Sequence, residues 1–389
     1  MAKKISNLLF VFTIFIFLII NVSRAIFSPD NKNEYENRKA NKMDSFSISG
    51  FLNGTFQDSM EAALSDQVFF AQEAKMNYNK IVSSYMQTTI TPIANKNRYI
   101  YLSDNFYLYG EDTILYEPYI FSELTGRLDK RTNLYNKIFA KYPDVDFYVY
   151  YIEKDTDINF ETGEKSYVYN YLKERLNLPE TNSGVFSINN FEDFSSYFYK
   201  TDHHWNAEGS KKGYEQVIRM LLGEEEPVIK PDQFSQVPGI MFSGSKTTSA
   251  ATGSYSEPFW AYTYTYTPMT ITENGIEVED FGNQQSYMAG KETTISYSQF
   301  YGGDMGEIIF DTSRPEKDNI LIIGESFDNA ILKLVASHFN VTVSIDLRNY
   351  ETFMEEKFSL KKHLKKHKID KVLLIGNADY FLLDEFVLE

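Results

Sequence analysis

The fold is decided by residues 319–376, which begin with the apolar run Asn319-Ile320-Leu321-Ile322-Ile323-Gly324. Two further runs of this kind follow at 341–347 and 371–376, and helical patterns at 328–339 and 353–367 separate the three. Strands that alternate with helices at this spacing predict βαβ units, and continuous apolar runs are typical of strands buried on both faces of a parallel sheet. We therefore expect an α/β fold built on a parallel sheet.

The pattern continues towards the N-terminus. Residues 146–152 form another continuous apolar run, and a helix is predicted before it over 122–141. Residues 98–102 and 106–110 predict paired strands, and the apolar spacing over 51–70 predicts one amphipathic helix that runs into a second. The sheet should thus recruit strands from both halves of the chain.

The composition changes sharply at two places and suggests the domain organisation. Residues 1–27 form an apolar N-terminal segment, and the polar residues 28–50 predict a linker. Residues 51–389 should form the folded domain. Within it, residues 228–303 are rich in Ser, Thr, Tyr and Gly and include the alternating stretch 262–267, which predicts a β-rich insertion.

The N-terminal segment has the length of a membrane-spanning helix. No residue from 5 to 22 is charged, and two lysines precede this stretch. Lysines on that flank orient the N-terminus inside and the rest of the chain outside the cell. Ser23 and Ala25 form a weak cleavage site for a secretory signal, but the bulky Arg24 lies between them. We therefore favour an uncleaved single-pass anchor with an extracellular domain, and secretion after cleavage remains the alternative.

Composition excludes several classes of function. The 389 residues carry 38 Lys and Arg against 54 Asp and Glu, so the formal net charge is −16. An acidic protein repels polyphosphate backbones, so we expect no nucleic-acid partner. The chain has 0 Cys, which excludes disulfides, thiolate metal sites and a cysteine nucleophile.

Ser326 is the candidate nucleophile. It follows the strand 319–324 and precedes the helix predicted over 328–339. In α/β sheets, ligands lie at the carboxyl ends of the strands, and a serine on such a turn is exposed beside backbone N–H groups that stabilise an oxyanion. A serine here also caps helices, which is the structural alternative. The second glycine of Gly-x-Ser-x-Gly is missing, so the α/β-hydrolase elbow is not expected.

A serine nucleophile needs a base, and the chain offers 5 histidines: His203, His204, His338, His363 and His367. The last two lie in a lysine-rich stretch that we interpret as the solvated face of a helix, and His338 as a packing or helix-end residue. The remaining cluster is Asp202-His203-His204-Trp205, in which Asp202 can hydrogen-bond an imidazole and fix its tautomer.

Metal sites are the competing interpretation of two acidic motifs. Asp202-His203-His204 could bind zinc or iron, but adjacent histidines point in different directions and no His-x-His or His-x-x-x-His pair accompanies them. Asp155-x-Asp157-x-Asn159 resembles the start of a calcium loop, but it lacks the required glycine and the terminal glutamate. We expect neither a resident metal nor a cofactor.

Thr201-Asp202-His203-His204-Trp205 followed by Gly324-Glu325-Ser326-Phe327 resembles the DHHW family of bacterial cell-surface proteins. Further matching pieces are Glu36-Asn37-Arg38, Asp66-Gln67-Val68-Phe69-Phe70 and Tyr301-Gly302-Gly303-Asp304. The family is similar to the SGNH-like proteins that O-acetylate alginate and other exopolysaccharides. The resemblance implies an SGNH-like parallel sheet sandwiched by helices, circularly permuted so that the Asp-x-His block precedes the serine.

The resemblance also implies roles for individual residues. It makes Ser326 the nucleophile, His204 the base and Asp202 its partner, with Glu325 in place of the family's Asp. It suggests Asn377 as an oxyanion donor, although Gly376-Asn377-Ala378-Asp379 matches the family block imperfectly. Three residues are candidates for substrate binding: Arg348, Trp205 and His203.

The function implied is serine-dependent transfer of an acetyl group to a cell-surface or secreted polysaccharide. The acetyl donor would come through a membrane-bound O-acyltransferase, because acetyl-CoA is not available outside the cell. Two alternatives remain open: an esterase that removes acetyl groups from such polymers, and a surface protein without catalytic activity.

Overall fold

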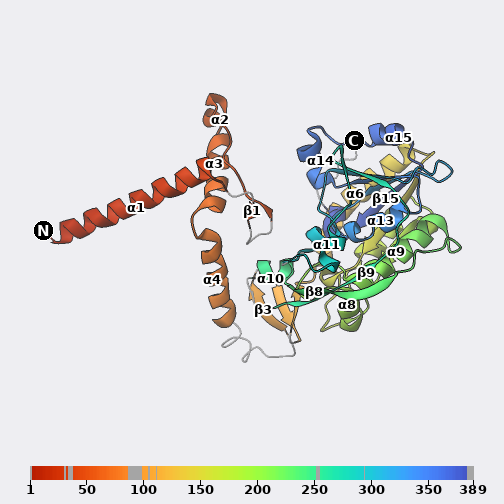
Figure 1. Cartoon of the computed structure of the whole chain (residues 1–389), viewed down its shortest axis with the longest axis horizontal. Coiled ribbons are helices and arrows are strands. Elements are labelled where there is room, and N and C mark those ends of the chain that lie inside the picture. Colours follow the sequence, from red (N-terminus) through yellow and green to blue (C-terminus); the bar gives the residue numbers. More distant parts are fainter. Residues whose placement is uncertain are drawn as a thin grey trace. The chain divides into compact units, whose positions relative to one another are not determined.

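The computed structural model describes residues 2–29, 32–33, 38–85, 99–103, 106–110, 112–250, 255–292 and 294–382. The chain divides into two compact units, of which the first comprises Met1–Gly110 and Ser245–Tyr255 and the second Glu111–Gly244 and Ser256–Glu389. Figure 1 shows the chain with its elements labelled.

The first unit begins with helix α1 (Ala2–Phe27), and its residues Asn7–Phe27 are long and apolar enough to cross a membrane. Two successive helices were expected over 51–70. The structure has three helices in and after this range: α2 (Ile48–Asn53), α3 (Thr55–Gln67) and α4 (Ala71–Tyr85). The expected hairpin is confirmed as β3 (Tyr99–Ser103) paired antiparallel with β4 (Phe106–Tyr109). This unit also contains the short ribbon of β1 (Lys32–Asn33) and β2 (Arg38–Lys39), and helix α10 (Ser245–Ser249).

The second unit is built on an eight-stranded sheet with the order β11-β10-β12-β14-β13-β15-β6-β7. Its parallel strands are β14 (Val341–Ile345), β13 (Ile320–Ile323), β15 (Lys371–Gly376), β6 (Asp146–Ile152) and β7 (Ser183–Phe186). The antiparallel extension is β12 (Glu307–Asp311), β10 (Thr270–Glu273) and β11 (Ile276–Val278). The predicted α/β fold with a mainly parallel sheet is confirmed.

The strand order reveals the circular permutation. If the parallel strands β13, β14, β15, β6 and β7 are numbered 1 to 5, their order across the sheet is 2-1-3-4-5. This is a common doubly wound arrangement. In this chain the strands in positions 4 and 5, β6 and β7, come first in the sequence. The histidine block after β7 therefore precedes the serine after β13, while both lie in the same unit.

Helices cover both faces of the sheet, which is why its strands are continuous apolar runs. Leu321 and Ile323 of β13 belong to a core with the inward residues of α6 (Phe121–Lys141), α7 (Val168–Arg175), α15 (Leu360–His367) and α16 (Ala378–Leu382). The alternate residues Ile320 and Ile322 are equally buried on the other face. Helices α9 (Ala207–Leu222) and α13 (Leu332–Ala336) contact each other and the strands β7 and β14 (Figure 1).

Two predicted helices differ from the structure, and two strands of the sheet were not predicted. The helix expected over 328–339 is a 3-10 turn, η4 (Asp328–Ala330), followed by the short α13. The helix expected over 353–367 is two helices, α14 (Leu347–Met354) and α15, because Glu355 adopts a left-handed φ of 56° and Ser359 caps a new start. Strands β7 and β12 were not predicted.

The region 228–303 is β-rich only in part. Strands β8 (Gln233–Phe242) and β9 (Glu257–Thr263) form an antiparallel ribbon, but β10 and β11 extend the main sheet instead of forming a separate layer. The alternating stretch 262–267 leaves its strand at Thr263. Two short helices complete the region, α11 (Gln284–Met288) and α12 (Tyr297–Tyr301).

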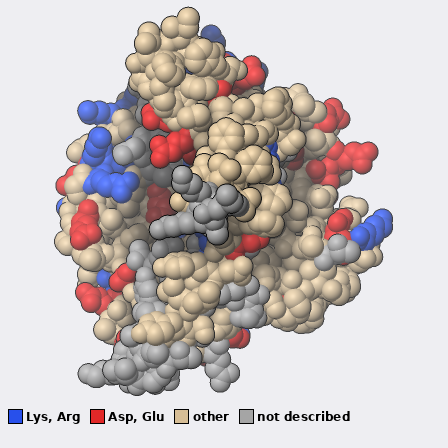
Figure 2. All heavy atoms as spheres, turned by 90° about the vertical axis from the view of Figure 1, so that its left-hand side faces the viewer, with Lys and Arg blue, Asp and Glu red and all other residues tan. Residues whose placement is uncertain are grey.

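The remaining elements of the second unit are β5 (Thr113–Tyr116), α8 (Phe191–Tyr197), η2 (Asp155–Asp157) and η3 (Glu180–Asn182). Figure 2 shows one face of the molecule, on which acidic and basic side chains are interspersed with uncharged ones.

Candidate active site

The candidate nucleophile lies where the sequence predicts it. Strand β13 ends at Ile323, and Gly324-Glu325-Ser326 lead from it into the turn η4. Ser326 is 9% exposed. Because β6, β14 and β15 run parallel to β13, the segments after them, which begin with Glu153, Asp346 and Asn377, lie at the same edge of the sheet.

The histidine block forms a tight turn between α8 and α9. Phe198 and Trp205 form an isolated antiparallel bridge across it, and Asn206 caps α9 by accepting hydrogen bonds from the N–H groups of the first turn. Inside the turn, the Asp202 carboxylate accepts a hydrogen bond from the backbone N–H of His204 at 3.0 Å. This local bond is the kind that Asp makes two residues ahead, and it orients both side chains.

His204 bridges Asp202 and Ser326. Its Nδ1 lies 2.6 Å from Asp202 Oδ1, and its Nε2 lies 2.7 Å from Ser326 Oγ. Both distances are within the range needed for proton transfer. With the carboxylate ionised, Nδ1–H donates to Asp202 and Nε2 is left to accept the Ser326 proton. Asp202 and His204 are 3% and 5% exposed, so little water competes for these bonds.

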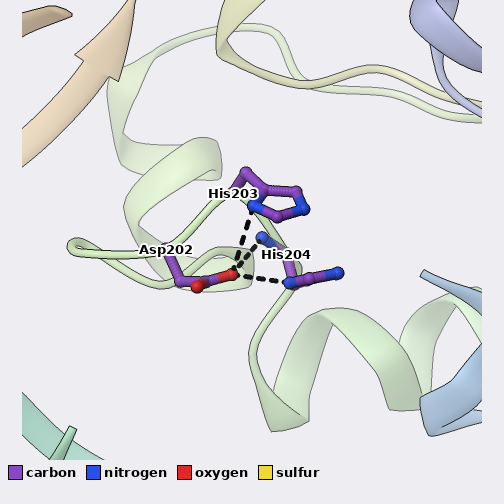
Figure 3. A group of neighbouring side chains, drawn as sticks. All are labelled: Asp202, His203 and His204. Atoms are coloured by element: carbon purple, nitrogen blue, oxygen red, sulfur yellow. Dashed lines mark hydrogen bonds and ion pairs between the residues drawn. The ribbon is translucent and has the colours of Figure 1, made fainter. Parts of the chain in front are cut away.

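His203 also faces Asp202 but is less tightly held. Figure 3 shows Nδ1 of His203 and Nδ1 of His204 both directed at the Asp202 carboxylate. The distance from His203 Nδ1 to Asp202 Oδ1 is 3.6 Å, and 29% of the His203 side chain is exposed. His203 therefore lies beside the Asp202–His204–Ser326 chain, with its ring centroid 3.9 Å from that of His204.

Trp205 does not reach the surface. Its side chain is 0% exposed, so the prediction that it binds substrate is wrong for this structure. The indole ring lies under α9, where a Cβ atom on Gly213 would be 2.4 Å from it. Its Nε1 donates a hydrogen bond to the hydroxyl of Tyr297 at 3.2 Å. Trp205 thus fixes the turn from within the core.

Tyr297 is a site residue that the sequence did not indicate. Its ring is stacked on the imidazole of His204, with centroids 3.7 Å apart and planes 2° from parallel. It comes from α12 in the insertion, where nothing in the spacing distinguishes it from neighbouring tyrosines. The negative face of an aromatic ring stabilises a cation above it, so Tyr297 favours the imidazolium that forms when His204 takes a proton.

We expect Tyr297→Leu to lower kcat/KM for acyl transfer about tenfold, because removing the ring forfeits roughly 1–2 kcal/mol of cation–π stabilisation. Tyr297→Phe keeps the ring and should stay near the wild-type rate. Equal losses of kcat/KM in both variants would mean that Tyr297 only packs.

Asn377 and Arg348 lie at the same edge as Ser326 and are held by carboxylates. The side-chain amide of Asn377 donates to Glu325 Oε1 at 2.8 Å. Arg348 pairs with Asp346 at 2.7 Å, with Asp304 at 3.1 Å and with Glu325 at 3.6 Å. The role of Asn377 in the oxyanion hole and that of Arg348 in substrate binding remain predictions.

The backbone N–H of Ser326 donates to no described residue and is the first candidate oxyanion donor.

Glu257 supports the histidine turn from the ribbon strand β9. Its carboxylate accepts hydrogen bonds from the backbone N–H and the hydroxyl of Thr201, both at 2.8 Å. Burial is the main cause that raises the pKa of Glu257 to about 7, and the nearby charge of Asp202 adds to it. A carboxyl group with a raised pKa favours the folded state while it is protonated, so this contribution is lost as the pH rises through about 7.

We therefore expect Glu257→Gln to be more stable than the wild type at about pH 8 and equal to it at about pH 4, below the ordinary pKa of 4.5, because glutamine cannot ionise. The shift from 4.5 to about 7 limits the difference to roughly 3 kcal/mol. Urea unfolding of both proteins at the two pH values measures it. A difference that does not change with pH would contradict this assignment.

The metal interpretations of the two acidic motifs fit the structure poorly. Ligand atoms of Asp202, His203 and His204 lie within 4.8 Å of one another, but both ring nitrogens of His204 already have partners. A metal ion would have to displace one of them. In the second motif, Oδ1 of Asp157 accepts hydrogen bonds from the hydroxyls of Tyr151 and Ser166, and Oδ2 accepts one from the backbone N–H of Lys154. Both oxygens that a calcium ion would need therefore already have partners.

Of the other three histidines, two are buried and one is half-buried. His338 lies between the Tyr214 hydroxyl and Glu226, as a packing residue. His363 was expected on a solvated face, and this is wrong: it is 2% exposed, and its Nε2 lies 3.1 Å from Glu307. The helix turns this position inwards although lysines surround it in sequence. His367 is half-buried, and burial lowers its pKa to about 4.

Comparison with known proteins places the chain among relatives of the same architecture. The family model described as DHHW protein matches residues 120–344. PatB1 of Bacillus cereus, solved with a sulfonyl adduct, is 19% identical with a TM-score of 0.55, covering 72% of this chain and 96% of PatB1. A DHHW family protein from Eubacterium siraeum is 14% identical with a TM-score of 0.56, covering 74% of this chain and 96% of the other.

A weaker likeness is that to the O-acetyltransferase domain of Pseudomonas putida AlgJ, with 9% identity and a TM-score of 0.36, covering 75% of this chain and 95% of that domain. The comparison with curated proteins gave no match. The family predicted from the sequence motifs is confirmed, and the PatB1 and Eubacterium siraeum structures share the fold of this chain.

Proposed function

The chain belongs to the DHHW protein family, and on this premise we propose that it is a serine-dependent O-acetyltransferase acting on a cell-surface or secreted polysaccharide. The single observation that carries the proposal is the hydrogen-bonded series from Asp202 through His204 to Ser326, at 2.6 and 2.7 Å. A buried acid, an oriented imidazole and a serine at the carboxyl end of a parallel strand are the parts that acyl transfer requires.

The reaction has two halves. His204 Nε2 takes the proton of Ser326 as Oγ attacks the carbonyl carbon of an acetyl donor, and the leaving group departs with that proton. Ser326 is now acetylated. A sugar hydroxyl then gives its proton to Nε2 and attacks the acetyl carbon, and Oγ leaves with the proton. Asp202 stabilises the imidazolium in both halves, and donors at the strand edge, among them the Ser326 N–H, stabilise the oxyanion.

The proposed location rests on α1. A helix of this length and apolarity suits a single-pass anchor or a signal sequence, and the paired lysines before it favour an anchor with the second unit outside. An extracellular enzyme lacks acetyl-CoA, so the acetyl group would be supplied by a membrane-bound O-acyltransferase. The proposed partners are therefore that donor protein, the membrane and a polysaccharide acceptor.

The reactivity of Ser326 can be tested without the donor. The chain with α1 in detergent is incubated with a chromogenic acetyl ester, with and without a neutral oligosaccharide. Acetylated oligosaccharide as the main product supports transfer, whereas free acetate at an unchanged rate indicates an esterase. Sulfonyl fluorides modify activated serines, and PatB1 was solved with a sulfonyl adduct. Labelling confined to Ser326 supports the nucleophile, and absence of both labelling and turnover argues for a non-catalytic surface protein.

A further inference from the structure

A small cavity beside Ser326 is lined by four carboxylates that the proposed reaction does not use. They are Asp304, Glu325, Asp328 and Asp346, and they are contributed by the loop before β12 and by the ends of β13 and β14. The cavity has a volume of about 10 Å³, which is the space that one water-sized particle needs. Ser344 and Asn329 add a hydroxyl and an amide to its lining.

The guanidinium of Arg348 forms ion pairs with three of these carboxylates. Arg348 contacts Asp346 at 2.7 Å, Asp304 at 3.1 Å and Glu325 at 3.6 Å. If all four carboxylates are ionised, the group as a whole carries four negative charges and one positive charge. Buried charge of one sign is costly unless it is compensated, and among the described residues Arg348 makes no ion pair with the fourth carboxylate, that of Asp328.

Asp328 has no such partner. It is 3% exposed, its Oδ2 is buried, and this oxygen accepts no hydrogen bond from the part of the chain that the structure describes. The carboxylate lies against the backbone of Gly324, where a Cβ atom would be 2.0 Å from Oδ2. Burial, together with the charges of Asp346, Asp304 and Glu325, raises the pKa of Asp328 well above its ordinary value.

We propose that this cavity binds one divalent cation of the Ca²⁺ or Mg²⁺ class, with Asp328 as a ligand. The lining provides carboxylate, hydroxyl and amide oxygens, which are the ligands of hard cations. Asn329 donates its amide nitrogen to Gly302 O and Asp304, so its carbonyl oxygen stays available as a ligand. The cation gives Asp328 the partner that it lacks and neutralises the charge between Asp304, Glu325 and Asp346.

The site is separate from the proposed catalytic series although it adjoins it. Glu325 and Asp328 flank Ser326 in sequence, so a bound cation would restrict the motion of the turn that carries the nucleophile. Binding should therefore stabilise the fold whether or not acyl transfer takes place. The inference does not depend on the proposed function.

The test uses the full chain in detergent after treatment with EDTA and its removal. Ca²⁺, Mg²⁺ and Mn²⁺ are titrated separately by calorimetry, and Mn²⁺ also by electron paramagnetic resonance. We expect one ion per chain for at least one of the three, and a rise in Tm on the order of 5 °C at saturation. Ser326→Ala should bind equally well, so failed catalysis and failed cation binding are distinguishable.

Asp328→Asn keeps the shape of the side chain and should weaken binding at least tenfold, whereas Asp318→Asn alters an exposed aspartate paired with Lys371 and should not. If Asp328→Asn does not fold, the stoichiometry and affinity of the wild type still decide the question. Wild-type protein that binds none of the three ions and shows no rise in Tm would overturn the proposal. So would Asp328→Asn protein that binds as tightly as the wild type.

Discussion

Replacing Ser326 with alanine should reduce acetyl transfer by about 10⁵-fold or more, to the level that substrate binding alone provides. In the proposed series the Ser326 hydroxyl oxygen is the atom that bonds to the acetyl group, and it lies 2.7 Å from His204 Nε2, which takes its proton. Mass spectrometry of the protein after incubation with an acetyl ester should show one added acetyl group on the wild type and none on the variant.

The matched control is Ser196→Ala, which removes an exposed hydroxyl on α8 that donates to Glu192 O. It should transfer acetyl groups at the wild-type rate. Circular dichroism checks that both variants are folded. If Ser326→Ala restores polymer acetylation in a strain that lacks the gene, the chain does not act through this serine and the enzyme proposal fails.

The central sheet could be predicted because each parallel strand is buried on both faces. Such burial leaves an uninterrupted apolar run, as in Ile320–Ile323, that is visible without any structural knowledge. The strands β10 and β12 are only four and five residues long and are only partly buried, so their sequences carry a weaker signal. The break between α14 and α15 rests on one left-handed residue, Glu355, of a type that rarely adopts that conformation.

The proposed catalytic residues could be predicted because they lie in two short motifs with distinct chemistry. The surroundings could not, because they depend on which helix face meets which strand. Trp205 was expected to bind substrate, and His363 was expected on a solvated face because of its lysine neighbours, but both face inwards. Tyr297 and Asp328 act through contacts made only after folding, a stacked ring in one case and a buried carboxylate without a partner in the other.

Asp202→Asn should lower kcat/KM by roughly 10³–10⁴-fold while leaving the fold intact. The carboxylate accepts the Nδ1–H of His204 at 2.6 Å and thereby keeps Nε2 free to take a proton from Ser326. An asparagine can present its amide N–H to Nδ1 instead, which moves the imidazole proton to Nε2, where it blocks the serine. Ester turnover and the rate of sulfonyl labelling at Ser326 should fall together, because both need the same deprotonated serine.

His203→Gln is the control that separates the two histidines. The His203 imidazole lies 3.6 Å from Asp202 and is partly exposed, so its loss should change kcat/KM by no more than a few fold. We expect a large effect for Asp202→Asn and a small one for His203→Gln, because His204 contacts both Asp202 and Ser326. A reversed order would assign the base to His203 and would require the turn to rearrange before the serine is activated.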